Sequence, residues 1–233
     1  MAKIQVKGTI ISDRQQRIYD WIGIEATSPS KVLSSLPTNN SSIEVVINSG
    51  GGDVFAGSEI FTALKEYPGE VIVKVVGLAA SAASVIAMAG DKVLISPTAQ
   101  MMVHNVSTFA AGDYRDFEHT VEILKSANQS IANAYKAKTG KTDDELKVLM
   151  DDETWFNAKT AVEQGFADEE MFNEDKGLLL SANFGTVALS EEAIEKIIGL
   201  IDTNPPKTAQ ENEGNMLLQA ELQLLKLKGG FHL

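Results

Sequence analysis

The sequence contains no cysteine and only three histidines in 233 residues. Without cysteine the chain can form neither a disulfide nor a thiolate nucleophile. Three scattered histidines also argue against a structural zinc site, which needs several closely spaced ligands. We therefore expect a protein that works without a metal ion or another cofactor.

Basic residues are also scarce, with 20 Lys and Arg against 32 Asp and Glu, which gives a formal net charge of -12. Such a chain is repelled by nucleic acid and by anionic membranes. The N-terminal stretch MAKIQVKGTIISD lacks the apolar run of a signal peptide, and charged residues interrupt the apolar region 71–95. We therefore expect a cytoplasmic protein that binds neither nucleic acid nor membrane.

Two successive units of strand, glycine turn and helix stand out in the first half of the chain. Residues 43–48 are rich in β-branched side chains and precede SGGGD at 49–53, after which residues 56–67 have helical spacing. Residues 71–76 form a second strand pattern, followed by Gly77 and an alanine-rich helix through Ala89. Successive βα units predict a parallel sheet covered by helices, hence the α/β class.

The second half of the chain is predicted to be mainly helical. Asp113 caps a long helix that ends near Gly140, and its apolar residues follow near-heptad spacing at Tyr114, Phe117, Val121, Leu124, Ile131 and Tyr135. We expect one α/β domain over residues 1–185 and three C-terminal segments. These are an amphipathic helix at 186–201, a polar linker at 202–215 and a leucine-rich amphipathic helix within 216–233.

The stretch GLAASAAS at 77–84 places Ser81 at a strand-to-helix turn. There a hydroxyl is exposed at the mouth of the sheet and the following amides point toward the helix N-terminus, as in a nucleophile elbow. The glycines at 50–52 follow the neighbouring strand and can supply a second N–H group aimed at the same point. Ser84 lies one turn inside the helix, and we expect it to be inert.

A serine becomes a nucleophile only when a base accepts its proton. His104 ends a short strand, whereas His119 lies within the long helix and His232 in the tail, so His104 is the candidate base. An acid to orient its imidazole can come from 151–153, just before the apolar pair Trp155 and Phe156, which we expect to anchor that loop.

Each of these residues also has a structural explanation. Ser81 can serve only for packing or as an N-cap, 50–52 as a simple turn, His104 as a structural histidine and 151–153 as a solvated acidic face. What favours catalysis is their conjunction, because nucleophile, base, acid and glycine turn all follow strands or anchored loops.

At these residues the sequence resembles the ClpP family of serine proteases, and more closely its phage branch, the head maturation (prohead) proteases. Four motifs carry the resemblance across residues 1–175 in family order. They are INSGGGDVFAGSEIFTAL at 47–64, GLAASAASVIAMAG at 77–90, MMVHN at 101–105 and WFNAKTAVEQGFAD at 155–168. The tail after residue 185 lies outside the resemblance.

The resemblance assigns roles residue by residue. Ser81 occupies the nucleophile position and His104 the histidine position, while the backbone amides of Gly52 and Ala82 fall at the oxyanion-hole positions. Glu153 stands where the family has its catalytic aspartate. Because a glutamate is one methylene longer, Asp152 is the alternative acid.

The resemblance also implies a fold, an assembly and a function. The fold is a ClpP/crotonase-like spiral of βα units with a long protruding helix at 113–139, through which the chains assemble into homo-oligomeric rings; the C-terminal helical tail is an addition to it. The activity is that of a serine endopeptidase acting through an acyl-enzyme. In the phage branch the substrates are capsid-assembly proteins, scaffold or head proteins, so the expected location is the host cytoplasm or the assembling prohead.

Two other functions are compatible with the same fold. The crotonase fold also serves acyl-CoA enzymes, but these need no Ser/His pair. The chain can also be a non-catalytic capsid-assembly factor on a retained protease fold, with the helix at 216–228 as its partner-binding segment. An unactivated Ser81 that does not react with a fluorophosphonate would favour that second function.

Overall fold

The computed structural model describes residues 1–172. The predicted segments at 186–201, 202–215 and 216–233, and the end of the predicted domain 1–185, lie outside the described residues. The elements in chain order are β1 (Ala2–Ile10), α1 (Asp13–Ile22), β2 (Ala26–Thr27), α2 (Pro29–Leu33), β3 (Ile43–Gly52), α3 (Val54–Glu66), β4 (Val71–Ala80), α4 (Ala82–Ala87), β5 (Lys92–Ile95), β6 (Gln100–Val103), α5 (Tyr114–Thr139), α6 (Asp143–Asp151), β7 (Thr154–Asn157), α7 (Ala158–Glu163) and β8 (Glu169–Glu170).

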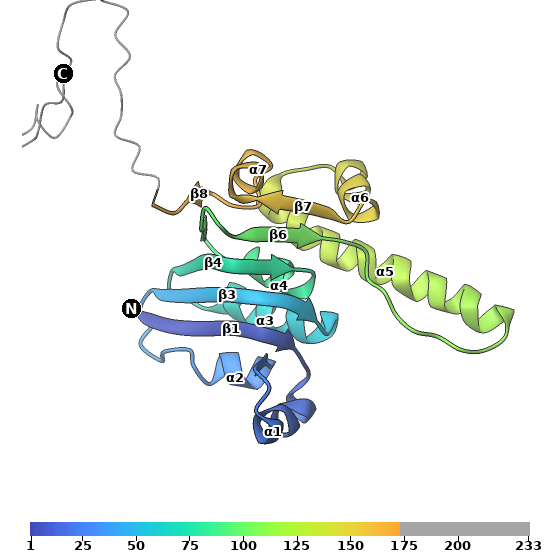
Figure 1. Cartoon of the computed structure of the whole chain (residues 1–233), viewed down its shortest axis with the longest axis horizontal. Helices are drawn as coiled ribbons and strands as arrows, with labels where there is room; N and C mark the ends of the chain where they lie inside the picture. Colours follow the sequence, from blue (N-terminus) through green and yellow to red (C-terminus); the bar gives the residue numbers. More distant parts are fainter. Residues whose placement is uncertain (173–233) are drawn as a thin grey trace, which may run out of the picture. The chain divides into compact units, whose positions relative to one another are not determined.

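The predicted α/β architecture with a parallel sheet is confirmed. The strands follow the order β2-β1-β3-β4-β5-β8, and each neighbouring pair in this order is parallel. Helices α3 and α4 lie behind the sheet in Figure 1, and α5 extends beyond it. Because these strands are parallel, their carboxyl ends lie at one edge of the sheet, which is where open α/β sheets bind ligands.

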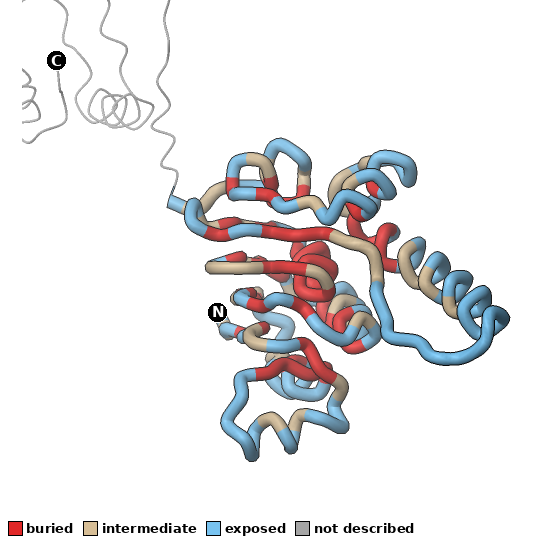
Figure 2. The backbone as a smooth tube through the Cα atoms, turned by 45° about the vertical axis from the view of Figure 1, so that its right-hand side comes forward, coloured by how far each residue is buried: buried red, intermediate tan, exposed pale blue. Residues whose placement is uncertain are grey.

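The core lies between the sheet and the helices α3 and α4. Val45 on β3 and Val73 on β4 are fully buried, as are Ile60 on α3 and Ile86 on α4. Every residue of α4 is buried, which explains its small side chains, since they let the helix lie close to β3. Figure 2 shows α4 in red, and red segments that alternate with tan and pale blue along the strands.

Strand β4 is longer than the sequence predicted. The strand was expected over 71–76, followed by Gly77 and a helix, but residues 77–80 belong to β4 and the helix begins at Ala82. The reason is a fork in the sheet. The first half of β4 pairs with β5, and Leu78–Ala80 pair with β6, so their backbone groups take part in a strand ladder. The helix also ends earlier than expected, at Ala87.

Helix α5 has the predicted caps. The Asp113 side chain accepts hydrogen bonds from backbone N–H groups of the first turn, and Gly140 ends the helix with a φ of 71°. Only its C-terminal part is buried, around Ile131 and Tyr135. The N-terminal half is mostly exposed in Figure 2, so the predicted apolar stripe remains largely uncovered there.

Helix α1 was not predicted from the sequence. Its N-terminus carries a capping box between Ser12 and Gln15. Its apolar residues Ile18, Trp21 and Ile22 share one face at helical spacing, but that face is exposed and none of the helix is buried. No helix in the stretch 1–172 has the length and the apolar character needed to cross a membrane.

Candidate active site

Ser81 lies at the junction of β4 and α4. Its N–H donates a 2.9 Å hydrogen bond to the carbonyl oxygen of Met102 on β6, which extends the β4–β6 ladder by one residue. Its backbone has φ 56° and ψ -126°, a conformation that residues other than glycine rarely adopt and that costs on the order of 1–3 kcal/mol. The sharp turn presents the side chain at the strand end, as in a nucleophile elbow.

The structure brings His104 to this serine. Because Ala80 pairs with Met102, the residues that follow β4 and β6 emerge side by side, and the Nε2 atom of His104 lies 2.7 Å from the Oγ of Ser81. A hydroxyl can donate to Nε2 only when the imidazole is neutral with its proton on Nδ1. His119 is an exposed residue of α5 and has no part in this contact.

Two hydrogen bonds anchor the chain that follows His104. The Asn105 side-chain amide donates to Oδ1 of Asp151 at 2.8 Å, and the Val106 N–H donates to the Asn128 side-chain oxygen on α5 at 2.7 Å. The hydrogen bonds from Lys147 and then Asn105 hold the pKa of Asp151 below its usual value. Sequence reasoning missed Asn105 and Asn128, because each acts through a partner more than twenty residues away.

Neither candidate acid forms a hydrogen bond to His104 within the described residues. Glu153 has a φ of 46° and its Oε1 accepts a long 3.4 Å hydrogen bond from Trp155, while Asp152 is the C-cap residue that follows α6. The antiparallel pairing of β6 with β7 sets Val103 opposite Thr154. The pairing ends there, so His104 directly follows β6 and Glu153 directly precedes β7 at the same end of this strand pair.

The loop before β7 is anchored by one of the two expected aromatic residues. Phe156 is buried and stacks on Phe166 with ring centroids 4.7 Å apart. Trp155 is instead half exposed, because alternate residues of a strand face opposite sides and Phe156 takes the inward position.

The glycine turn at the end of β3 packs directly against Ser81. A β-carbon on Gly51 would lie 2.7 Å from the Cβ of Ser81, and one on Gly52 would lie 2.1 Å from the carbonyl oxygen of Ile10. Both glycines have positive φ values, 93° and 146°. Only glycine fits at these two positions.

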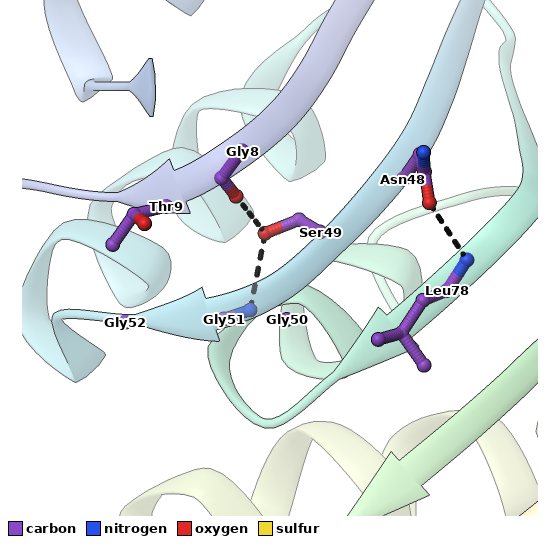
Figure 3. A pocket seen from close by; sticks show the side chains of 8 residues that line it. All are labelled: Gly8, Thr9, Asn48, Ser49, Gly50, Gly51, Gly52 and Leu78. Atoms are coloured by element: carbon purple, nitrogen blue, oxygen red, sulfur yellow. Dashed lines mark hydrogen bonds between the residues drawn. The ribbon is translucent and has the colours of Figure 1, made fainter. Parts of the chain in front are cut away.

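Ser49 fixes the course of this turn. Its hydroxyl donates to the Gly8 carbonyl at 2.6 Å and accepts from the Gly51 N–H at 3.1 Å, as Figure 3 shows. A cavity of about 370 Å³ opens beside these bonds, lined by Gly8, Thr9, Asn48, Ser49, the three glycines and Leu78. It contains neither Ser81 nor a histidine, so it is not the place where the reactive groups meet.

Those groups meet in a smaller cavity of about 120 Å³, whose lining includes Ser81, His104, Gly52 and Ala82. Its other walls are mainly apolar, formed by Val54, Val85, Val106 and Ile131 with Ser107. Ala82 is the first residue of α4, so its N–H has no acceptor within the helix. Residues 1–172 present no group of three or more acidic or histidine side chains arranged to hold a metal ion.

Comparison with known proteins agrees with this geometry. The family model described as Clp protease matches residues 14–174. ATP-dependent Clp protease proteolytic subunit 1 of Leifsonia xyli is 26% identical over 175 residues, which cover 71% of this chain and 87% of the relative. Its counterpart in Corynebacterium jeikeium is 31% identical over 155 residues, covering 65% and 81% respectively. Subunit 2 of Tropheryma whipplei is 24% identical over 173 residues, covering 70% and 96%.

The match begins within α1 and continues through β8, so it includes both Ser81 and His104. It spans well over half of the chain, and the relatives are named as proteolytic subunits. The chain belongs to the Clp protease family and is a serine-type peptidase.

Proposed function

We propose that Ser81 and His104 form the catalytic pair of an endopeptidase that acts through an acyl-enzyme. The observation that carries this proposal is the 2.7 Å contact between Oγ and Nε2 at a strained strand-to-helix turn. Nε2 accepts the Ser81 proton while Oγ bonds to the carbonyl carbon of the scissile peptide. The same proton then passes to the departing amine as the C–N bond breaks.

Deacylation follows the same route with water as the nucleophile. Nε2 accepts a proton from the water, whose oxygen bonds to the acyl carbon, and the proton returns to Oγ as the ester bond breaks. The negative charge on the carbonyl oxygen is balanced in both steps by the N–H groups of Gly52 and Ala82. Their presence in the same small cavity as Ser81 supports this assignment.

We propose Glu153 as the acid that orients His104, with Asp152 as the alternative. The β6–β7 pairing supports Glu153, because it ends at Val103 and Thr154, the immediate neighbours of His104 and Glu153. The exposed Glu153 side chain makes only a long hydrogen bond to Trp155, so in this proposal its carboxylate turns away from Trp155 to accept from Nδ1 of the imidazole. A carboxylate there would hold the Nδ1–H tautomer, in which Nε2 can accept the Ser81 proton.

The substrates, we propose, are capsid-assembly proteins of a phage or prophage, scaffold or head proteins, cleaved in the host cytoplasm or inside the prohead. Support comes from the sequence resemblance of the four motifs to the phage branch. We also propose a homo-oligomeric ring. The apolar residues that α5 leaves exposed support it, since a monomer gains nothing from presenting Tyr114, Phe117 and Val121 to water.

Co-expression with phage scaffold and head proteins tests the proposal. We expect wild-type protein to shorten a scaffold or head protein, and Ser81→Ala and His104→Ala to leave it intact. Intact-mass measurement of the capsid proteins gives the cleavage site. Cleavage by Ser81→Ala at the wild-type rate would contradict the proposed nucleophile. Wild-type cleavage of unrelated proteins with capsid proteins left intact would contradict the proposed substrates.

A further inference from the structure

A buried chain of hydrogen bonds leads from α5 to the backbone of Ser81. The hydroxyl of Tyr135 lies 2.8 Å from the Oγ of Ser84, and that Oγ lies 2.6 Å from the carbonyl oxygen of Ser81. Both Tyr135 and Ser84 are fully buried. Neither residue lines the small cavity, so neither can touch a substrate bound there.

The direction of this chain follows from its proton count. Ser84 has one hydroxyl proton, and the carbonyl oxygen of Ser81 can only accept, so Ser84 donates to Ser81 and must accept from Tyr135. Burial raises the pKa of Tyr135 well above its usual range, which keeps its hydroxyl protonated. The edge-to-face contact with Phe166, with centroids 5.6 Å apart, holds the Tyr135 ring in place.

The Ser81 carbonyl oxygen, where this chain of hydrogen bonds ends, belongs to the peptide group that also carries the Ala82 N–H. Because a peptide group is planar, fixing the Ser81 carbonyl also fixes the direction of the Ala82 N–H. Three donors hold that carbonyl: the N–H groups of Ser84 at 2.9 Å and Val85 at 3.2 Å, and the Ser84 hydroxyl at 2.6 Å. Ser84 supplies two of the three, and its side chain supplies the shortest.

We propose that Ser84 and Tyr135 are positioning residues, which hold the Ser81–Ala82 peptide so that the Ala82 N–H points at the developing oxyanion. This inference rests on the proposed function, in which Ser81 attacks and Ala82 is an oxyanion donor. The strained φ of Ser81 explains why the peptide needs a side-chain hydrogen bond besides the helical ones. Ser84, which we expected to be inert, thereby acquires a role.

Saturation kinetics of labelling with a fluorophosphonate test the inference, because the phosphoryl oxygen takes the place of the oxyanion. Loss of a whole oxyanion donor slows catalysis about 10²–10³-fold, so a misdirected one in Ser84→Ala should slow kinact about tenfold. KI should stay unchanged, since ground-state binding does not use this donor. Tyr135→Phe should slow kinact less, because Ser84 can still donate to Ser81.

The double variant separates positioning from general stability. If Tyr135 acts only through Ser84, Ser84→Ala/Tyr135→Phe labels no more slowly than Ser84→Ala alone. Its Tm should be higher than that of Ser84→Ala, since Tyr135→Phe removes a buried hydroxyl left without a partner. Tyr67→Phe, which loses a 2.6 Å bond to the Ser41 carbonyl, and Ser130→Ala, which loses a 3.0 Å bond to the Ser126 carbonyl, are the matched controls.

Tyr67→Phe should lower Tm without changing kinact, and Ser130→Ala, at an exposed helix position, should change neither by much. A wild-type kinact in both Ser84→Ala and Tyr135→Phe would overturn the inference while leaving Ser81 as the nucleophile. Additive slowing of kinact in the double variant would show that Tyr135 does not act through Ser84, which would overturn the proposed chain of hydrogen bonds. Labelling of Ser81→Ala at the wild-type rate would instead contradict the proposed function itself. Tyr135→Phe keeps the packing on Phe166, so it carries the test if Ser84→Ala does not fold.

Discussion

At the scale of single residues, the site depends on close backbone approach. Gly51 leaves no room for a side chain beside Ser81, and Gly52 leaves none beside Ile10. The motif SGGG was expected to form a turn with available amides, and its last two glycines are required by this contact. The strained φ of Ser81 is therefore held by packing on one side and by hydrogen bonds on the other.

Gly51→Ala should disturb the site far more than Gly50→Ala. The new methyl group would lie 2.7 Å from the Ala80 carbonyl oxygen and from the Ser81 Cβ, and the cost of such overpacking is on the order of 1–3 kcal/mol. A β-carbon on Gly50 meets nothing within 4 Å, so Gly50→Ala is the control. Gly51→Ala should therefore have a lower Tm and slower fluorophosphonate labelling than Gly50→Ala. Equal Tm values and labelling rates would contradict the close packing of Gly51 against Ser81.

Glu153→Gln and Asp152→Asn distinguish the two candidate acids. If Glu153 orients His104, Glu153→Gln should slow labelling of Ser81 at least about a hundredfold, whereas Asp152→Asn should label normally. Labelling rates measured side by side at one pH make the comparison. The opposite pattern would assign the role to Asp152, and no effect of either substitution would mean that the pair works without an acid.

At the scale of elements, the fork in β4 explains why the site forms. Its first half pairs with β5 and its last residues pair with β6, so Ser81 and His104 leave adjacent strands. The sequence predicted the two residues and the strands before them, because turn and periodicity signals are local. It missed the true end of β4, since pairing of Leu78–Ala80 with β6 outweighs the local preference of alanine for helix.

Long-range hydrogen bonds were beyond sequence analysis for a similar reason. Asn128 with Val106 and Ser84 with Tyr135 join α5 to the two sides of the site, and nothing in the residue types identifies those partners. Helix α1 was missed because it has no buried face, and β7 because its four residues give too short a pattern.

A charged cluster links three strands and predicts the acid sensitivity of the sheet. Glu44 on β3 lies between Lys74 on β4 and Lys3 on β1, and these lysines lower its pKa, Lys74 most. A carboxylate with a lowered folded-state pKa stabilises the fold above its unfolded value and loses that contribution as the pH falls. The ordinary pKa of a glutamate side chain is 4.5.

Thermal unfolding between pH 6 and pH 3 measures this contribution. Wild-type Tm should fall as the pH drops below about 4.5. Glu44→Gln should have a lower Tm than wild type at pH 6, and its Tm should fall less between pH 6 and pH 3. Glu163 forms a longer, exposed ion pair with Lys159, at 3.8 Å, so Glu163→Gln should keep the wild-type dependence of Tm on pH. An unchanged slope in Glu44→Gln would contradict a stabilising role for the cluster.

At the scale of the whole molecule, the exposed apolar residues of α5 bear on the proposed homo-oligomeric ring. Phe117 and Val121 lie one helical turn apart and remain about half exposed, at 48% and 46%. Phe117→Glu/Val121→Glu should reduce the molar mass measured by light scattering, while Gln129→Glu should not. A wild-type protein that is monomeric at micromolar concentration would contradict the proposed ring.

The central claim is an activated serine, and intact-protein mass after fluorophosphonate treatment tests it most directly. We expect the mass of one probe adduct on wild-type protein, and no adduct on Ser81→Ala or His104→Ala under the same conditions. This result would follow from a nucleophile at Ser81 activated by His104 at 2.7 Å. An adduct on Ser81→Ala, or none on a folded wild-type protein, would contradict the account.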